Sequence, residues 1–175
     1  MPFELIAMNP TVSIIMGSTS DLPIVKKAAD FLEQMEVPFE LRALSAHRTP
    51  DAVADYAKNA VANGTKVIIA AAGMAAALPG VVASMTTLPV IGLPIASTLD
   101  GMDALYSICM MPPGIPTATV GINAGLNAGV LAVRILALAD EDLAARYDAY
   151  VDSLKNKIEK ADADLRAVDG YKYKV

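Results

Sequence analysis

The sequence has 175 residues, of which 54% are hydrophobic, and a formal net charge of −5. This length fits one domain with a substantial core, and the negative charge argues against a nucleic-acid partner, because nucleic-acid binders present basic surfaces. With one cysteine, Cys109, and one histidine, His47, the chain can form neither an intrachain disulfide nor a Cys/His zinc site, although a carboxylate site for Mg²⁺ stays possible.

Short runs typical of strands alternate with helical patterns along the chain. After Met1–Glu4, which lacks the basic start of a signal peptide and leads us to expect a cytoplasmic protein, the predicted strands are Thr11–Met16, Phe39–Leu44, Lys66–Ala71, Pro89–Leu93 and Pro116–Gly121. The helices predicted to follow them are Leu22–Gln34, Pro50–Asn63, Ala75–Ser84, Gly101–Met110 and Ala124–Leu138. This alternation, with continuously apolar strands, predicts an α/β domain with a parallel sheet covered on both faces.

A last helix is predicted over Glu141–Ala167, after the alternating core at residues 11–139 of what we expect to be a single domain, 1–175. Its apolar residues recur at spacings of three and four, which places them on one face of a helix. That face needs a partner, and both a neighbouring subunit and the helix's own domain are candidates. The face comprises Tyr147, Val151, Leu154, Ile158, Ala161 and Leu165.

Charged residues are almost absent from the middle of the chain. Between Val67 and Val133 the only ones are Asp100 and Asp103. Interspersed glycines and prolines break this stretch into pieces too short to span a membrane, and no Lys/Arg cluster flanks it. We therefore expect burial inside the domain and between subunits, in an obligate homo-oligomer with a large apolar interface.

The loop after the first strand has the features of an anion cradle. Ligands of open parallel sheets bind beyond the carboxyl ends of the strands. Gly17 permits a tight turn there, and the hydroxyls of Ser18, Thr19 and Ser20 accompany backbone amides at a helix start. Asp21 would repel a phosphate but could bind sugar hydroxyls. A plain helix cap is the alternative, and the loop is neither a P-loop nor a dinucleotide fingerprint.

The only histidine lies on the loop after the second strand, Ser45–Pro50. A lone histidine is often structural, but His47 stands next to Arg48 at the edge where ligands bind. Arg48 can grip a phosphate with two hydrogen bonds, and imidazole exchanges protons near neutral pH. Thr49 is predicted to cap the helix that begins at Pro50. We interpret the loop as a site for proton transfer on a phosphorylated substrate.

Small residues dominate the loop after the third strand, where Ala72, Gly73 and Met74 precede Ala77 and Leu78. Short side chains would let a flat ligand lie close to the backbone, although alanine is also the best helix former. Later in the chain, Met110–Pro116 is too rich in proline for a helix. We predict that this segment, which includes Met111, forms a stiff flap over a pocket.

Taken together, these loops resemble the PurE family, the N5-carboxyaminoimidazole ribonucleotide mutases of purine biosynthesis. The resemblance covers residues 12–160, and its specificity lies in the order of the motifs rather than in any one of them. The matching segments are Met16–Asp21, Ser45–Asp51, Leu78–Gly80, Asp103–Ser107, Met111–Pro116 and Asn127–Gly129.

The resemblance implies a flavodoxin-like three-layer αβα sandwich with a five-stranded parallel sheet and an extra C-terminal helix. It also implies a homo-octamer in which that helix reaches a neighbour. The implied reaction moves a carboxylate from N5 to C4 of an imidazole ribonucleotide, without metal, ATP, biotin or another cofactor. The partners implied are thus a small-molecule substrate and further copies of the chain, with neither nucleic acid nor membrane.

The resemblance assigns roles by position. His47 is implied to be the general acid and base, while Ser18, Asp21 and Arg48, assisted by Ser20, hold the ribose phosphate. The apolar loops, with Ala72, Gly73, Met74, Ala77, Leu78 and Met111, are implied to contact the substrate, exclude water and retain CO2.

The chain departs from the family pattern at two of these positions. Members usually carry a second histidine where this chain has Ala77, and glycine is common where it has Met74. The departure leaves open a changed substrate or a divergent branch.

Three other functions compete with the mutase. An aminoimidazole ribonucleotide carboxylase uses free CO2 on the same scaffold, but Arg48 and Leu78–Gly80 favour the mutase. A non-catalytic flavodoxin-like nucleotide or flavin module would need aromatic residues to stack on the ligand, and the chain has only nine in total. A carboxylase of nickel-pincer cofactor synthesis lacks support because the Met111–Pro116 flap favours the purine branch.

Overall fold

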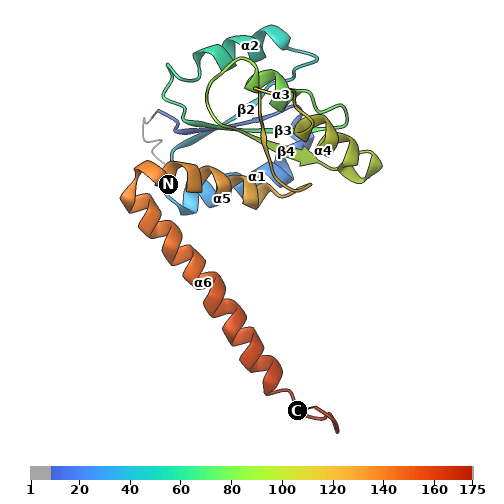
Figure 1. Cartoon of the computed structure of the whole chain (residues 1–175), viewed down its shortest axis with the longest axis vertical. Coiled ribbons are helices and arrows are strands. Elements are labelled where there is room, and N and C mark those ends of the chain that lie inside the picture. Colours follow the sequence, from blue (N-terminus) through green and yellow to red (C-terminus); the bar gives the residue numbers. More distant parts are fainter. Residues whose placement is uncertain (1–8, 175) are drawn as a thin grey trace, which may run out of the picture.

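The computed structural model describes residues 9–174 (Figure 1). Its strands are β1 (Val12–Met16), β2 (Phe39–Ala43), β3 (Val67–Gly73), β4 (Val90–Ile95) and β5 (Ala118–Thr119). Its α-helices are α1 (Leu22–Gln34), α2 (Pro50–Asn59), α3 (Leu78–Ala83), α4 (Met102–Cys109), α5 (Gly125–Leu136) and α6 (Glu141–Arg166). Short 3-10 turns lie at η1 (Thr19–Asp21), η2 (Leu99–Gly101) and η3 (Ala137–Ala139).

The strands form one parallel sheet in the order β2-β1-β3-β4-β5. This order is that of flavodoxin-like folds, in which the chain reverses its direction of winding between β1 and β3. The α/β class and the flavodoxin-like architecture predicted for the chain are therefore confirmed.

Alternate residues of the central strands build two cores, one on each face of the sheet. Ile14 of β1 belongs to the core between the sheet and helices α1 and α5. Its neighbour Ile15 belongs to the core between the sheet and helices α2, α3 and α4. The same split separates Ile69 from Ile68 in β3. Both layers are visible in Figure 1, with α1 and α5 below the sheet and α2, α3 and α4 above it. Burial on both faces explains why these strands are apolar without interruption.

Two predicted elements are shorter in the structure. The strand predicted over Pro116–Gly121 is reduced to β5, which pairs with Ile91 and Gly92 at the sheet edge; Pro116 has no N–H to donate to a ladder. The helix predicted from Ala75 begins only at Leu78. Met74 has a left-handed φ of 57°, which no helix continues, and Pro79 lies in the first helical turn, where proline is favoured.

The second helix also differs from its prediction at both ends. Its regular part ends at Asn59, and turns continue to Gly64, whose φ of 91° stops the chain as glycine commonly does. The predicted side-chain cap by Thr49 is wrong, because its hydroxyl donates to the backbone oxygen of Ser45 at 3.1 Å instead.

The last helix, α6, forms over nearly all of its predicted range and leaves the body as an arm (Figure 1). Its start packs on the domain: Leu143 is 2% exposed, and the ring of Tyr150 meets that of Phe31 edge-on with centroids 4.9 Å apart. Further on, Ile158 and Leu165 are 69% and 67% exposed. Own-domain packing thus accounts for the beginning of the predicted apolar face and leaves the rest without a partner among the described residues.

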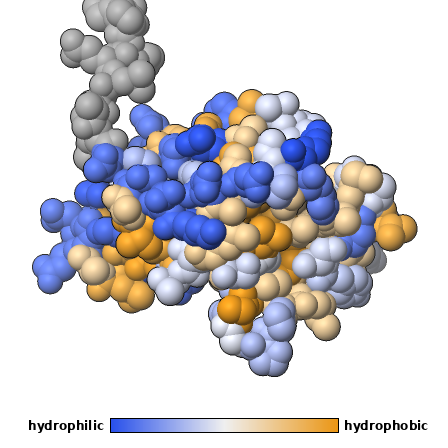
Figure 2. All heavy atoms as spheres, turned by 90° about the horizontal axis from the view of Figure 1, so that it is seen from above, coloured by the Kyte–Doolittle hydropathy of each residue, from blue (hydrophilic) through white to orange (hydrophobic). Residues whose placement is uncertain are grey.

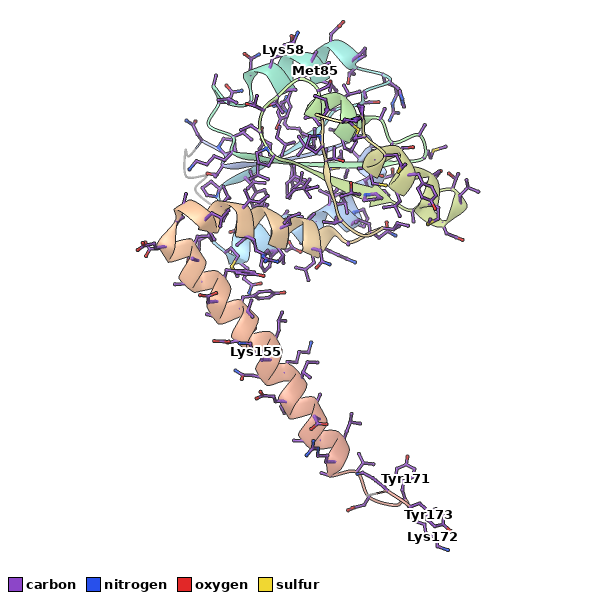
Figure 3. All side chains as sticks on the ribbon, in the orientation of Figure 1. Lys58, Met85, Lys155, Tyr171, Lys172 and Tyr173 are labelled. Carbon is purple, nitrogen blue, oxygen red and sulfur yellow. The ribbon has the colours of Figure 1, made fainter. Side chains whose placement is uncertain are left out.

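The C-terminal end of α6 is capped by a residue of the tail that follows it. The Lys174 ammonium donates to the carbonyl oxygens of Leu165 and Arg166, at 2.8 and 2.6 Å, and so satisfies two acceptors that the helix end leaves open. Figure 3 shows Tyr171, Lys172 and Tyr173 beyond this end, far from Lys58 and Met85 on the body. Within residues 9–174, no helix combines the length and the apolar character needed to cross a membrane.

Candidate functional site

The loops that follow β1, β2, β3 and β4 enclose a cavity of about 590 Å³ at the carboxyl edge of the sheet. Its position is the one expected from the parallel topology, next to the reversal between β1 and β3. The lining residues are Gly17, Ser18, Ser20, Asp21, Ser45, Ala46, His47, Arg48, Ala72, Gly73, Met74, Ala75, Ala76, Ala77, Leu78, Ile95 and Ser97.

The first loop supplies a chain of hydroxyls that ends at a buried carboxyl. The Ser18 hydroxyl accepts from the backbone N–H of Ser20 at 3.3 Å and from the Ser20 hydroxyl at 2.8 Å. The Ser20 hydroxyl also lies 3.2 Å from Asp21 Oδ1. Asp21 is only 8% exposed, and this burial raises its pKa, although hydrogen bonds from Ser20 and Ser18 oppose the rise.

The second loop is fixed to the first by an arginine. Arg48 Nη2 donates to the carbonyl oxygen of Gly17 at 2.8 Å, and its Nε lies 3.4 Å from the Ser45 hydroxyl. The same hydroxyl accepts the backbone N–H of Arg48 at 3.2 Å, and Thr49 closes the turn onto Ser45. The guanidinium is therefore held at the cavity with donors to spare for an anion.

His47 lies at the tip of this turn, and its side chain is exposed. Within residues 9–174, no side chain or backbone group hydrogen-bonds to its ring. The imidazole thus borders the cavity beside Arg48 with both nitrogens available to a ligand.

The third loop forms a wall of short side chains. A Cβ on Gly73 would lie 3.1 Å from the carbonyl oxygen of Ile95, so a larger residue here would need β4 to shift by a few tenths of an ångström. Ala76 and Leu78 are buried, whereas Met74 is 55% exposed. This part of the cavity lining is apolar, whereas the first two loops supply its polar groups.

Met111 is the predicted site residue that lies outside the cavity lining. A Cβ built on Gly80 of α3 would come within 2.9 Å of the Met111 sulfur, so the methionine packs directly against this glycine. The other ten predicted site residues all line the cavity: His47, Ser18, Ser20, Asp21, Arg48, Ala72, Gly73, Met74, Ala77 and Leu78.

The loop after the fourth predicted strand, Pro94–Asp100, is expected at this edge from the strand order, but none of its residues was predicted as a site residue. Ser97 and Ile95 line the cavity, and their loop is held by Asn123, whose side-chain oxygen accepts the backbone N–H of Ala96 at 2.9 Å. The position of Ser97 just beyond a strand end was the signal that could have identified it. Across residues 9–174, no group of three or more His, Cys, Asp or Glu side chains is arranged to hold a metal ion.

The fold and the cavity define an α/β protein of flavodoxin-like topology whose ligand site combines an arginine, a histidine and a hydroxyl-rich loop. A family model described as AIR carboxylase matches residues 11–157. The chain belongs to this family, which confirms the resemblance predicted from its motifs.

Its relatives carry two different names. The chain is 50% identical over 164 residues to the N5-carboxyaminoimidazole ribonucleotide mutase of Thermotoga maritima, with 93% of this chain and 95% of that protein covered. It is 54% identical over 156 residues to the phosphoribosylaminoimidazole carboxylase of Schizosaccharomyces pombe, with 88% of this chain but 28% of that protein covered. The chain therefore spans less than a third of the fungal relative's length.

A solved structure supports the same kinship. The crystal structure of Treponema denticola PurE superposes with a TM-score of 0.81 at 34% sequence identity, covering 89% of this chain and 98% of that one. The flavodoxin-like architecture is thus shared with a structure described as PurE.

Proposed function

We propose that the protein is an N5-carboxyaminoimidazole ribonucleotide mutase, an isomerase of de novo purine biosynthesis that forms 4-carboxy-5-aminoimidazole ribonucleotide. The observation that carries this proposal is the joining of two loops by Arg48 and Gly17, 2.8 Å apart. The joined loops both line the cavity that His47 borders, which supports a role for Arg48 in binding the phosphate next to His47. A phosphorylated ligand held there has a proton-transfer group within its reach.

In this proposal the ribose phosphate lies between the first two loops. Arg48 binds the phosphate with its remaining N–H groups, and the hydroxyls of Ser18 and Ser20 complete the anion site. Asp21 accepts a hydrogen bond from a ribose hydroxyl, since it lies at the end of the hydroxyl chain. The imidazole ring of the substrate then faces the apolar residues of Ala72–Ala77, which keep water from the ring.

His47 moves one proton twice in the proposed reaction. The imidazolium first protonates N5 as the N–C bond of the carbamate breaks, which releases CO2 and leaves the amine. C4 of the ring then attacks the retained CO2 and forms the new C–C bond. Neutral His47 finally removes the proton from C4, which restores the aromatic ring and the imidazolium. No cofactor enters this scheme, because the proton that is given is the proton that is recovered.

Replacement of His47 by asparagine tests the assignment. Turnover of the carbamate should fall by at least about a hundredfold, because general acid–base groups contribute on that scale. Since His47 is exposed and makes no contact that holds the fold, the assembly state and the urea midpoint should match those of the wild type. Substantial activity of His47→Asn with the carbamate would refute the acid–base role.

Carboxylation of aminoimidazole ribonucleotide by free CO2 is a second candidate, favoured by the name of the Schizosaccharomyces pombe relative. The two functions are separated by supplying each substrate alone to the purified wild-type protein. We expect turnover of the carbamate. Turnover of aminoimidazole ribonucleotide with bicarbonate, and none of the carbamate, would replace the mutase by the carboxylase.

We further propose that the protein acts in the cytoplasm as a homo-octamer. Support for the assembly comes from a row of four exposed apolar side chains within α4 and on either side of it, which one more copy of the chain would cover. The row consists of Leu99, Met102, Tyr106 and Met110, which are 75%, 38%, 57% and 77% exposed. The uncovered length of α6 offers a second surface for a neighbour.

A further inference from the structure

Met74 combines a conformation that methionine rarely adopts with a place at the cavity. Its φ of 57° lies in the left-handed region, where the Cβ of an ordinary residue crowds the backbone. Glycine would make the same turn without this crowding. Strain of this kind persists where the side chain or the surrounding structure requires it, and it concentrates at functional sites.

The surroundings of Met74 indicate what its side chain is for. On the wall between β3 and α3, the other residues end at Cα or Cβ, apart from Leu78, which is 2% exposed and packs in the core. Met74 is 55% exposed and lines the cavity. It is therefore the one long and exposed side chain of this wall, in the same cavity as the groups that hold the ribose phosphate in the proposed function.

We propose that Met74 is a specificity-determining residue whose thioether packs on the face of the imidazole ring. This inference rests on the proposed function. A methionine side chain is flexible enough to follow a small ring that short alanines cannot reach, and sulfur makes favourable contacts with aromatic rings. The side chain thereby selects ribonucleotides with a flat aromatic base over the bare sugar phosphate.

Binding of two probes by isothermal titration calorimetry tests the contact. Aminoimidazole ribonucleotide carries the ring, whereas ribose 5-phosphate lacks it. Met74→Gly should weaken binding of the ribonucleotide about three- to tenfold, the scale of a sulfur–aromatic contact, and leave binding of ribose 5-phosphate unchanged. Met74→Leu, which retains apolar bulk but lacks the sulfur, should weaken binding of the ribonucleotide less than Met74→Gly does.

A matched control separates the side chain from the backbone. Glu36 has a φ of 55° and ends α1, where Val37 N–H donates to the Leu32 oxygen at 2.9 Å in the motif that usually carries glycine. Glu36→Gly and Met74→Gly should both raise the urea midpoint, because both relieve a left-handed residue. Only Met74→Gly should change the affinity for the ribonucleotide.

The outcomes distinguish this inference from the proposed function. Equal ribonucleotide affinity of Met74→Gly and the wild type would overturn the role of Met74 while the mutase assignment stands. Equal weakening of both probes would also overturn it, because the loss would then concern the pocket as a whole. A wild-type protein that binds neither probe would contradict the proposed function itself, and the inference with it.

Discussion

At the scale of single residues, Asp21 is a cavity residue whose buried carboxyl lowers the stability of the folded protein. Its carboxyl is nearly buried, with the Ser20 hydroxyl 3.2 Å away. Burial penalises the charged form more than the hydrogen bonds stabilise it, so the pKa is raised. A residue in this state is better explained by a ligand that uses its oxygens than by a contribution to stability.

Replacement of Asp21 by asparagine should therefore stabilise the protein at neutral pH. The pKa of Asp21 is higher in the folded state than in the unfolded state, so wild-type stability falls as pH rises through these two values and is flat above them. Asp21→Asn lacks this loss. The difference in free energy of unfolding between Asp21→Asn and the wild type, measured by urea titration, should be greatest at pH 7. It should vanish below about pH 3.9, where the Asp21 carboxyl is protonated in both the folded and the unfolded state.

Asp55→Asn provides the matched control, because Asp55 is exposed on α2 and lies outside the cavity lining. It should leave the dependence of stability on pH as in the wild type. An Asp21→Asn protein no more stable at pH 7 than at pH 3.5, relative to the wild type, would show that burial of this carboxyl carries no penalty.

The site residues that could be predicted share a local signal. Ser18, Asp21, His47 and Arg48 are polar groups on the loops that follow β1 and β2, and parallel topology brings all such loops to one edge. The hydrogen bond that Asn123 accepts from Ala96 of the loop after β4 has no such signal, because the two residues are 27 positions apart in the sequence. The contact of Met111 with Gly80 of α3 likewise joins residues far apart in the sequence, and the predicted role of Met111 at the substrate stays a prediction.

At the scale of elements, the first turns of α6 attach this helix to the rest of the domain. Asp140 Oδ1 accepts the backbone N–H of Leu143 at 2.9 Å, which satisfies one of the open donors of the first turn. Leu143 is itself buried, and Arg146 Nε donates to the Met35 oxygen at 3.1 Å. The cap therefore anchors the residues that tie α6 to α1.

Asp140→Ala should lower the free energy of unfolding by about 1 kcal/mol, the usual cost of losing a side-chain cap. Urea titration at a fixed protein concentration measures it, since assembly also affects stability. Asp142→Ala is the control, because Asp142 is an acid of the same turn without the cap hydrogen bond; its loss through the helix dipole should be only about 0.3–0.5 kcal/mol. Equal losses in the two variants would deny Asp140 its capping role.

Whole elements were easier to predict than their ends. The pattern of α1 specified both boundaries, because proline opens it and its apolar face ends with it. The start of α3 was predicted too early, since Ala75–Ala77 favour a helix locally and only the left-handed turn at Met74 keeps them out of one. The turn follows directly on Gly73, where β3 runs close to β4, a tertiary contact that local propensity does not reveal.

At the scale of the whole molecule, charge and apolar surface are separated in space as they are in the sequence. Figure 2 looks down on the α2 side, where hydrophilic residues form a band and hydrophobic side chains gather beside it. The stretch that is nearly free of charge, Val67–Val133, supplies the buried strands β3 and β4 and also the exposed row on α4. One core would need only the first of these, so the second supports an interface between copies.

The arm tests this proposal most directly. At 26 residues, α6 is about 39 Å long. Most of the stability of a helix in a protein comes from packing of its apolar face, so we expect this face to contact another surface. If a neighbour covers that face, Ile158→Asp should weaken the assembly, because it places a charge in an apolar contact. Asn156→Asp adds the same charge two residues away, on the polar side of the helix, and should leave the assembly intact.

Light scattering coupled to size-exclusion chromatography measures the difference. Wild type and Asn156→Asp should both have a mass of about 146 kDa, eight times the 18.3 kDa of one chain, and Ile158→Asp should give smaller species. A monomeric wild type would contradict the octamer. An octameric Ile158→Asp protein would instead remove α6 from the interface and leave the α4 row as the surface that joins the subunits.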